Sequence, residues 1–141
     1  MKKDLEKITA FIAKHHVMSL ATTYSQELSV CSLFYAYDEE RFSFIVASSE
    51  DTLHVKHILQ NPKIAGNILL ETQEVGKIEG LQFQGEMQAV QENSLKKLYY
   101  KRFPYSLAMM PKFWQIKVSF FKLTDNRLGF GKKIIYEPVF L

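Results

Sequence analysis

The chain has 141 residues, of which 47% are hydrophobic and 23% charged, a balance typical of a globular protein. The formal net charge is only +3 and lysines are interleaved with acidic residues, so we expect no nucleic-acid partner. A single cysteine, Cys31, excludes an internal disulfide, and no stretch approaches the roughly 20 apolar residues of a membrane helix. We therefore expect one cytoplasmic domain over residues 1–141, with no membrane partner.

The first half of the chain predicts one helix followed by three strands. Asp4 can cap a helix that ends near His15. Its apolar residues recur at helical spacing on one face: Leu5, Ile8, Phe11 and Ile12. Strands are expected at 17–23, 28–37 and 42–48, because β-branched and aromatic residues dominate there and short polar turns separate them.

The second half predicts two more helices and three more strands. Ser49 or Asp51 can cap a short helix that Asn61 and Pro62 end, because the residue before proline is pushed out of the helical region. A helix at 92–103 is halted by Pro104. Strands are expected at 63–70, 77–90 and 114–123.

Residues 77–90 show the period of two that marks a strand with one buried face. Leu81 and Phe83 alternate with Gln82 and Gln84. About six strands with three short helices, and no regular βαβ alternation, predict a mainly β (α+β) fold. We expect an antiparallel β-barrel with peripheral helices.

The closing segment L-G-F-G-K-K, Leu128 to Lys133, resembles a phosphate loop but lacks its pattern. It has neither the Walker A spacing nor the third glycine of a dinucleotide fingerprint. The simpler interpretation is a glycine-kinked strand with solvated lysines. Lys132 and Lys133 nevertheless stand at a kink where they could face an anion.

A second candidate anion site is the segment S-S-E-D-T-L-H, Ser48 to His54. Ser48, Ser49 and Thr52 supply hydroxyl groups, and a helix amino terminus supplies free N–H groups with a partial positive charge. The alternative is an ordinary helix-capping cluster.

Metal binding and hydrolysis are not indicated. His54 and His57 lie three residues apart on one helix face, but zinc needs three or four protein ligands and no further pair accompanies them. No nucleophile elbow or Ser/His/Asp signature is visible.

In order along the chain, several motifs resemble the flavin-binding split-barrel superfamily that includes pyridoxamine 5′-phosphate oxidase. More narrowly, they resemble the small bacterial group typified by YhbP. The matching motifs are F-Y-A-Y-D, T-L-H, N-P-K-I-A-G, G-L-Q-F-Q-G-E, K-R-F-P, the strand of Trp114 and K-L-T-D-N-R-L-G-F-G-K-K. This resemblance spans nearly the whole chain and implies a six-stranded antiparallel split β-barrel with short peripheral helices.

The resemblance also implies a homodimer with two FMN sites at the subunit interface. The flavin ring would lie against the second strand and near the strand of Gln82, with the partner subunit contributing the Trp114 strand and the terminal segment. The cofactor-binding residues that it implies are Ser32, Leu33, Phe34, Ser48, Ser49, Thr52, Leu53, His54, Gln82, Trp114, Lys132 and Lys133.

Two departures from the oxidase pattern are visible. Leu53 and His54 stand where that pattern has an Arg-Lys pair for the FMN phosphate, so at least one charge-assisted contact is missing. No arginine motif for a pyridoxal-type substrate is recognisable in the terminal segment, so vitamin B6 oxidation is not expected. The sequence marks no catalytic acid or base.

The leading hypothesis is an FMN-dependent oxidoreductase, such as a flavin reductase, whose substrate the sequence leaves open. Three alternatives keep the fold. One is a non-catalytic flavin-binding dimer, and one is a split barrel whose site is empty. The third is a haem-binding dimer in which a histidine (His15, His16, His54 or His57) ligates the iron.

Overall fold

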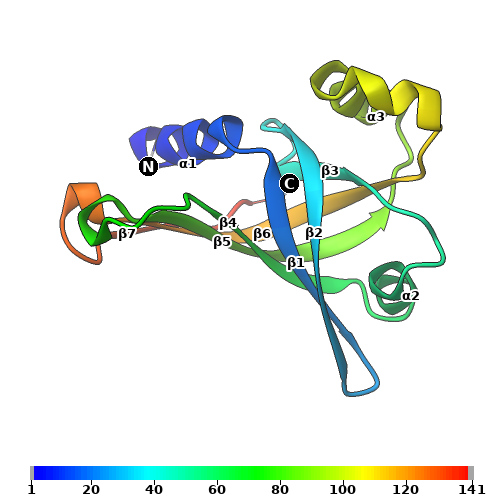
Figure 1. Cartoon of the computed structure of the whole chain (residues 1–141), viewed down its shortest axis with the longest axis horizontal. Coiled ribbons are helices and arrows are strands. Elements are labelled where there is room, and N and C mark those ends of the chain that lie inside the picture. The colour runs from blue at the N-terminus through cyan, green and yellow to red at the C-terminus, as the bar shows by residue number, and fades with distance from the viewer. Residues whose placement is uncertain (1, 140–141) are drawn as a thin grey trace.

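The computed structural model describes residues 2–139, and all its strands belong to one antiparallel sheet that closes on itself (Figure 1). Its helices are α1 (Lys2–Lys14), α2 (Leu53–Gln60) and α3 (Asn93–Arg102), with short 3₁₀ segments at Val75–Lys77, Pro104–Met109 and Asn126–Leu128. Its strands are β1 (Val17–Tyr24), β2 (Glu27–Asp38), β3 (Ser43–Ala47), β4 (Lys63–Leu69), β5 (Glu79–Ala89), β6 (Phe113–Asp125) and β7 (Lys133–Tyr136).

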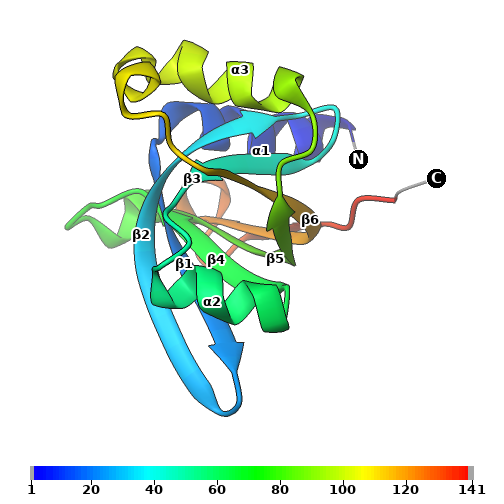
Figure 2. The same cartoon turned by 90° about the vertical axis from the view of Figure 1, so that its right-hand side faces the viewer.

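The strand order is β3-β2-β1-β4-β5-β6-β7, and β3 also pairs with β6. Six strands therefore form a closed barrel, and β7 lies outside the ring at the free edge of β6. The expected mainly β fold with a six-stranded antiparallel barrel is confirmed. The helices α1 and α3 lie on one side of the barrel and α2 lies on the other (Figure 2).

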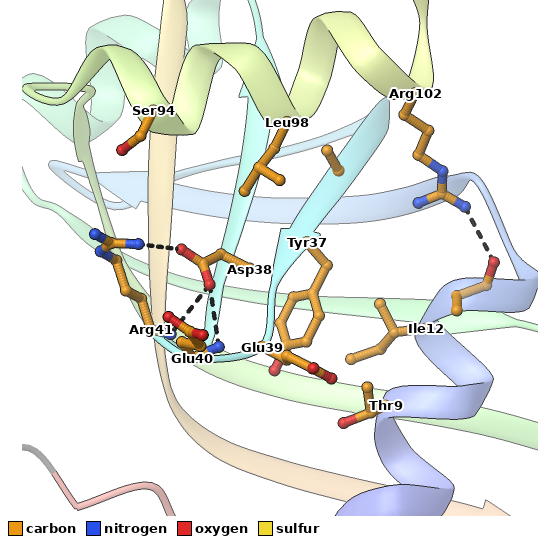
Figure 3. A pocket seen from close by; sticks show the side chains of 12 residues that line it. Thr9, Ile12, Tyr37, Asp38, Glu39, Glu40, Arg41, Ser94, Leu98 and Arg102 are labelled. Carbon is orange, nitrogen blue, oxygen red and sulfur yellow. Dashed lines mark hydrogen bonds and ion pairs between the residues drawn. The ribbon is translucent and has the colours of Figure 1, made fainter.

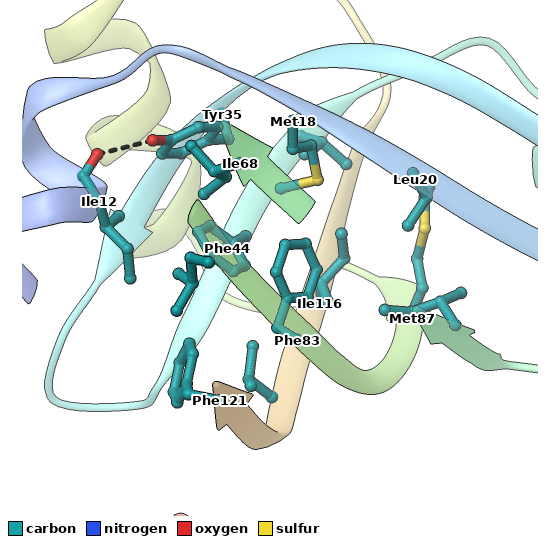
Figure 4. Close-up of a cluster of buried hydrophobic side chains, with 14 of the residues drawn as sticks. Ile12, Met18, Leu20, Tyr35, Phe44, Ile68, Phe83, Met87, Ile116 and Phe121 are labelled. Atoms are coloured by element: carbon teal, nitrogen blue, oxygen red, sulfur yellow. Dashed lines mark hydrogen bonds between the residues drawn. The ribbon is translucent and has the colours of Figure 1, made fainter. Parts of the chain in front are cut away.

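The barrel interior is filled by large apolar side chains that alternate along each strand (Figure 4). The ring of Phe44 packs against those of Tyr35 and Phe83, with centroids 5.2 and 4.8 Å apart. Leu81 and Phe83 of β5 point inward while Gln82 and Gln84 are exposed, as the period of two predicts. This alternation leaves a second, polar surface on the outside of the barrel.

The helix α3 covers the outer face of β3. Ile45, Leu95, Tyr99 and Phe113 form a second buried cluster, separate from the barrel interior. The short strand β3 is therefore buried on both faces, which explains its continuous apolar run.

Arg102, at the end of α3, ties α1 to β2. Its guanidinium donates to the carbonyl of Tyr35 at 3.0 Å and to that of Ala13 at 3.3 Å, and it also donates to the carbonyl of His15. The same guanidinium lies 5.0 Å from the Tyr35 ring centroid. Tyr35 Oη donates to the carbonyl of Ile12 at 2.6 Å. Carbonyl groups that the end of α1 leaves without a helical partner are thus satisfied by two side chains from elsewhere in the fold.

Three details differ from the sequence prediction. The helix α1 begins at Lys2, so Asp4 lies within its first turn and is not its cap. The cap of α2 is Thr52, because Thr52 Oγ1 accepts a hydrogen bond from the backbone N–H of Val55; neither Ser49 nor Asp51 caps the helix. The terminal L-G-F-G forms the connection between β6 and β7, where Gly129 and Gly131 adopt positive φ angles of 138° and 72°.

Replacing Arg102 by methionine should lower the free energy of unfolding by about 2 kcal/mol, because carbonyl groups at the end of α1 lose a charged donor. Urea denaturation followed by circular dichroism measures this. Lys101→Met is the matched control, since Lys101 is exposed and should leave the stability nearly unchanged. Equal stability of the two variants would contradict the structural role of Arg102.

Candidate functional site

Most of the residues that the sequence singled out fall into three places, whereas Leu33 and Trp114 lie in the barrel interior. One group lies on the outer face of the barrel, one lies between β3 and α2, and the terminal lysines lie next to β7. In Figure 1, α2 and β7 are at opposite ends of the molecule, so one chain does not bring all three groups together.

The outer face carries a continuous polar row across five strands. Ser32 of β2 pairs with Ser19 of β1, Ser19 pairs with Asn67 of β4, and Asn67 pairs with Gln82 of β5. Gln82 in turn pairs with Lys122 of β6. Residues paired directly across antiparallel strands point to the same face of the sheet, so these side chains form one line. The predicted residues Ser32 and Gln82 therefore share a surface.

A shallow cavity of about 500 Å³ lies along this row. Its floor is low because Ala21 and Ala65 carry small side chains. Gly66 faces the barrel interior, where a Cβ atom would lie only 2.4 Å from the ring of Phe83, so the glycine makes room for that ring. The cavity is lined by Ser19, Leu20, Ala21, Val30, Ala65, Gly66, Asn67, Gln82, Phe83, Gln84 and Phe120.

Leu33 and Phe34 point in opposite directions. Leu33 packs against the barrel interior, so the structure places its side chain away from the outer face. Phe34 is 55% exposed, and its ring meets that of Phe103 edge to face at 5.5 Å. Of these two predicted residues, only Phe34 is available to a ligand on the outside of the barrel.

The hydroxyl groups between β3 and α2 all have partners within the chain. Thr52 Oγ1 donates to the carbonyl of Ser49 at 2.8 Å, and Ser49 Oγ donates to Asp51 Oδ1 at 2.5 Å. Ser48 Oγ and His54 Nε2 are hydrogen-bonded at 2.5 Å. Ser49 and Asp51 are exposed, so their hydrogen bond is open to exchange with a ligand, whereas Ser48 is fixed by a buried ring.

His54 does not supply a positive charge to this segment. Its side chain is only 8% exposed, and burial together with the neighbouring His57 lowers its pKa below the usual range. Its Nε2 atom is also within 3.3 Å of Thr52 Oγ1. Leu53, the other residue at the position of the Arg-Lys pair, is an exposed apolar side chain. The charge missing from the sequence motif is therefore not restored by His54.

His57 fastens α2 to the first hairpin. Its Nδ1 atom is hydrogen-bonded to Thr22 Oγ1 at 2.8 Å, and Glu27 Oε1 accepts from its Nε2 atom at 2.7 Å. Thr22 and His57 are each 3% exposed, whereas Glu27 lies on the surface. This buried arrangement positions the helix and leaves no free ring nitrogen on His57.

Trp114 is not on a surface that a partner subunit could reach. It is 1% exposed, and its Nε1–H donates to the carbonyl of Ser48 at 2.9 Å. It therefore supports the Ser48 segment of its own chain. Lys132 and Lys133 are exposed at the start of β7, where the backbone N–H of Asp125 donates to the carbonyl of Lys132 at 3.0 Å.

A further cavity of about 610 Å³ lies between α1, the β2–β3 turn and α3 (Figure 3). Asp38, Arg41 and Arg102 in its lining are engaged with charged side chains or with the backbone. Arg41 pairs with Asp38 at 2.6 Å and with Glu92 at 3.1 Å, and Arg102 holds the end of α1. This cavity is thus a junction between elements, distinct from the polar row.

Within residues 2–139, no three His, Cys, Asp or Glu side chains gather closely enough to hold a metal ion. The same part of the chain contains no helix with the length and hydrophobicity needed to cross a membrane.

Sequence reasoning missed Ser19, Asn67 and Lys122 in the polar row. Each lies within a predicted strand or beside its end, but the pairing register that aligns them with Ser32 and Gln82 is a property of the folded sheet. The alternation of Gln82 and Gln84 with buried residues was the available signal, because it marks the exposed face of β5.

No family model matches the chain. A UPF0306 protein of Enterobacter sp. (strain 638) is 37% identical over 135 residues, which cover 94% of this chain and 95% of that protein. Several solved structures share the fold at low sequence identity. A haem-binding protein of Mycobacterium smegmatis has a TM-score of 0.78 at 12% identity, covering 95% of this chain and 57% of the other.

A Listeria innocua protein assigned as a pyridoxamine 5′-phosphate oxidase has a TM-score of 0.68 at 14% identity, covering 84% of this chain and 96% of the other. The split-barrel fold that the sequence resemblance implies is confirmed by these shared folds. Because the identity to the Enterobacter protein extends over nearly the full length of both chains, this chain belongs to the UPF0306 family.

Proposed function

We propose that the protein is an FMN-binding oxidoreductase that works as a homodimer, with its cofactor sites at the subunit interface. The observation that carries this proposal is the polar row on the outer face of the barrel. It combines hydroxyl, amide and ammonium groups in one line above a floor of small residues.

The row suits the chemistry of a flavin ring. A flavin is flat, and its polar atoms lie along one edge, where they need both donors and acceptors. The amides of Asn67 and Gln82 supply both, and the Ser19 and Ser32 hydroxyls do so as well. The low floor at Ala21 leaves room for a flat ring to lie on the sheet.

The exposed Ser49 hydroxyl and its neighbour Ser48 are the groups that would hold the FMN phosphate. In this resemblance the phosphate lies at the end of the third strand, and the structure has these hydroxyls directly after β3. The bound flavin would supply the redox chemistry. The chain would bind the polar edge of the ring and keep the phosphate and ring ends in a fixed relation.

A second copy of the chain would cover the outer face. Leu28 and Val30, on the edge of the polar row, are 80% and 74% exposed. Met109 and Met110 in the connection before β6 are 80% and 85% exposed. Large exposed apolar side chains of this kind mark interaction surfaces, and burying Leu28 and Val30 against a second copy would also exclude water from a bound ring.

The haem alternative depends on a free histidine. His57 has both ring nitrogens hydrogen-bonded, and His54 is buried with its Nε2 atom engaged. His15 is partly buried against the ring of Phe11 at 4.4 Å, which leaves the exposed His16 as the histidine open to a ligand. FMN is favoured because the polar row matches its hydrogen-bonding edge.

The purified protein should show the absorption bands of oxidised flavin, or gain them when FMN is added to colourless protein. A Soret band would instead indicate haem, and no spectral change with either ligand would contradict cofactor binding. Anaerobic addition of a nicotinamide donor should bleach the flavin bands. A bound flavin that no such donor reduces would indicate a binding protein and count against the reductase.

Gln82→Leu should weaken FMN binding by about tenfold, because a buried polar edge of the ring would lose its partner. Fluorescence quenching of FMN on titration with protein measures the dissociation constant. The control is Gln88→Leu, an exposed glutamine on the same strand that lies outside the cavity. Equal FMN affinity of the two variants would show that the polar row is not part of the FMN site.

Val30→Glu should convert the dimer to a monomer, because it places a charge in the apolar part of the proposed interface. Light scattering coupled to size-exclusion chromatography measures the mass. Gln73→Glu adds the same charge in the exposed β4–β5 connection and should remain dimeric. A parent protein that is monomeric with FMN bound would contradict an interfacial site.

A further inference from the structure

A cavity of about 560 Å³ lies between the end of β3 and the 3₁₀ segment Pro104–Met109. One wall carries the hydroxyl-bearing Ser48 and Ser49, and another carries the apolar side chains of Met109 and Met110. Among its lining residues in the described part of the chain, Lys112 alone carries a positive charge. The cavity therefore places one cation beside the hydroxyls to which we assign the phosphate.

Lys112 is held beside Ser48 by the backbone. The N–H of Ser48 donates to the carbonyl of Lys112 at 3.0 Å, directly beyond the last pair of the β3–β6 ladder, Ala47 with Phe113. The hydrogen bond from Trp114 Nε1 to the Ser48 carbonyl fixes the same junction from the other side. The backbone of Lys112 is thus held next to Ser48 by the same strand pairing that closes the barrel.

The ammonium group of Lys112 has an exchangeable partner. It lies 3.0 Å from Glu50 Oε1 and 5.7 Å from the centroid of the Trp114 ring. The side chains of Lys112 and Glu50 are 47% and 60% exposed, so this ion pair is solvated and of the weak surface kind. A doubly charged phosphate next to Ser49 would compete with the single carboxylate for the same ammonium.

The other basic side chains near this segment or in the terminal segment are less suited to hold a phosphate beside Ser49. His54 is buried, and its lowered pKa disfavours the charged ring. Lys56 lines a separate groove with Tyr24 and Glu27. Lys132 and Lys133 lie beside β7, at the opposite end of the molecule from α2.

We propose that Lys112 is the phosphate-binding cation of this protein, and that it replaces the Arg-Lys pair that Leu53 and His54 displace from the sequence motif. Glu50 is its counter-ion in the ligand-free protein and is released when phosphate binds. This inference rests on the proposed FMN site, and it assigns to Lys112 and Glu50 effects of opposite sign on the affinity for a phosphate-bearing ligand.

The test compares FMN with riboflavin, which has the same ring and no phosphate. Lys112→Met should weaken FMN binding about tenfold and leave riboflavin binding unchanged, because only the phosphate contact is lost. Glu50→Gln should tighten FMN binding, since it removes the competing carboxylate. The loss of FMN affinity caused by Lys112→Met should be smaller at high salt, because salt screens the contact between ammonium and phosphate. Lys101→Met, a change of the same type on the exposed face of α3, is the control.

A second measurement keeps this inference separate from the proposed function. Inorganic phosphate is titrated into ¹⁵N-labelled protein while the backbone amides of Ser48 and Ser49 are followed by NMR, with sodium chloride at matched ionic strength as the reference. Phosphate-specific shifts in the parent that disappear in Lys112→Met support the anion site, even if the parent binds neither flavin.

Three outcomes would overturn the assignment of Lys112. One is equal FMN affinity of Lys112→Met and the parent. Another is an equal loss of FMN and riboflavin binding, which would indicate a general disturbance of the site. The third is a parent protein whose Ser48 and Ser49 amides respond no differently to phosphate and to chloride.

Discussion

Five residue pairs join β3 to β6, from Ser43 with Lys117 to Ala47 with Phe113, and they close the barrel. The partners are about 70 residues apart in the chain, so their pairing is costly in chain entropy and depends on the interior that it encloses. Phe44 and Val46 of β3 point into that interior, whereas Ile45 points outward beneath α3. A strand buried on both faces is well suited to hold such a closure in place.

Closure also determines what surrounds the segment after β3. Because β3 ends beside the start of β6, Ser48 is joined to Lys112 through the backbone and to Trp114 through its indole N–H. A loop that reads in sequence as a helix cap thus becomes one side of a cavity whose other side comes from more than 60 residues later. A cation does not have to come from the local sequence motif, because strand pairing brings Lys112 beside Ser48.

The cation beside Ser48 is Lys112 and not a histidine of α2. His54 and His57 stand side by side on α2, but each ring is buried and hydrogen-bonded, with Ser48 and with Thr22 and Glu27. They anchor the helix to the barrel. Burial disfavours a positive charge on His54, whereas Lys112 keeps its ammonium in solvent. The exposed lysine is therefore the group better able to meet an anion.

The sequence by itself determined the β-rich fold, nearly all the strand and helix positions, and the exposed face of β5, because period-two alternation and Asn-Pro or charged turns are local signals. It also contained the motifs of the split-barrel superfamily. Local signals could not align Ser32, Ser19, Asn67, Gln82 and Lys122, since register between strands depends on which interior side chains pack together. The family resemblance implied a cofactor role for Trp114, and no local signal marked Lys112. Only the closed barrel decided that Trp114 is core and that Lys112 lies beside Ser48, because both follow from a contact between residues far apart in the chain.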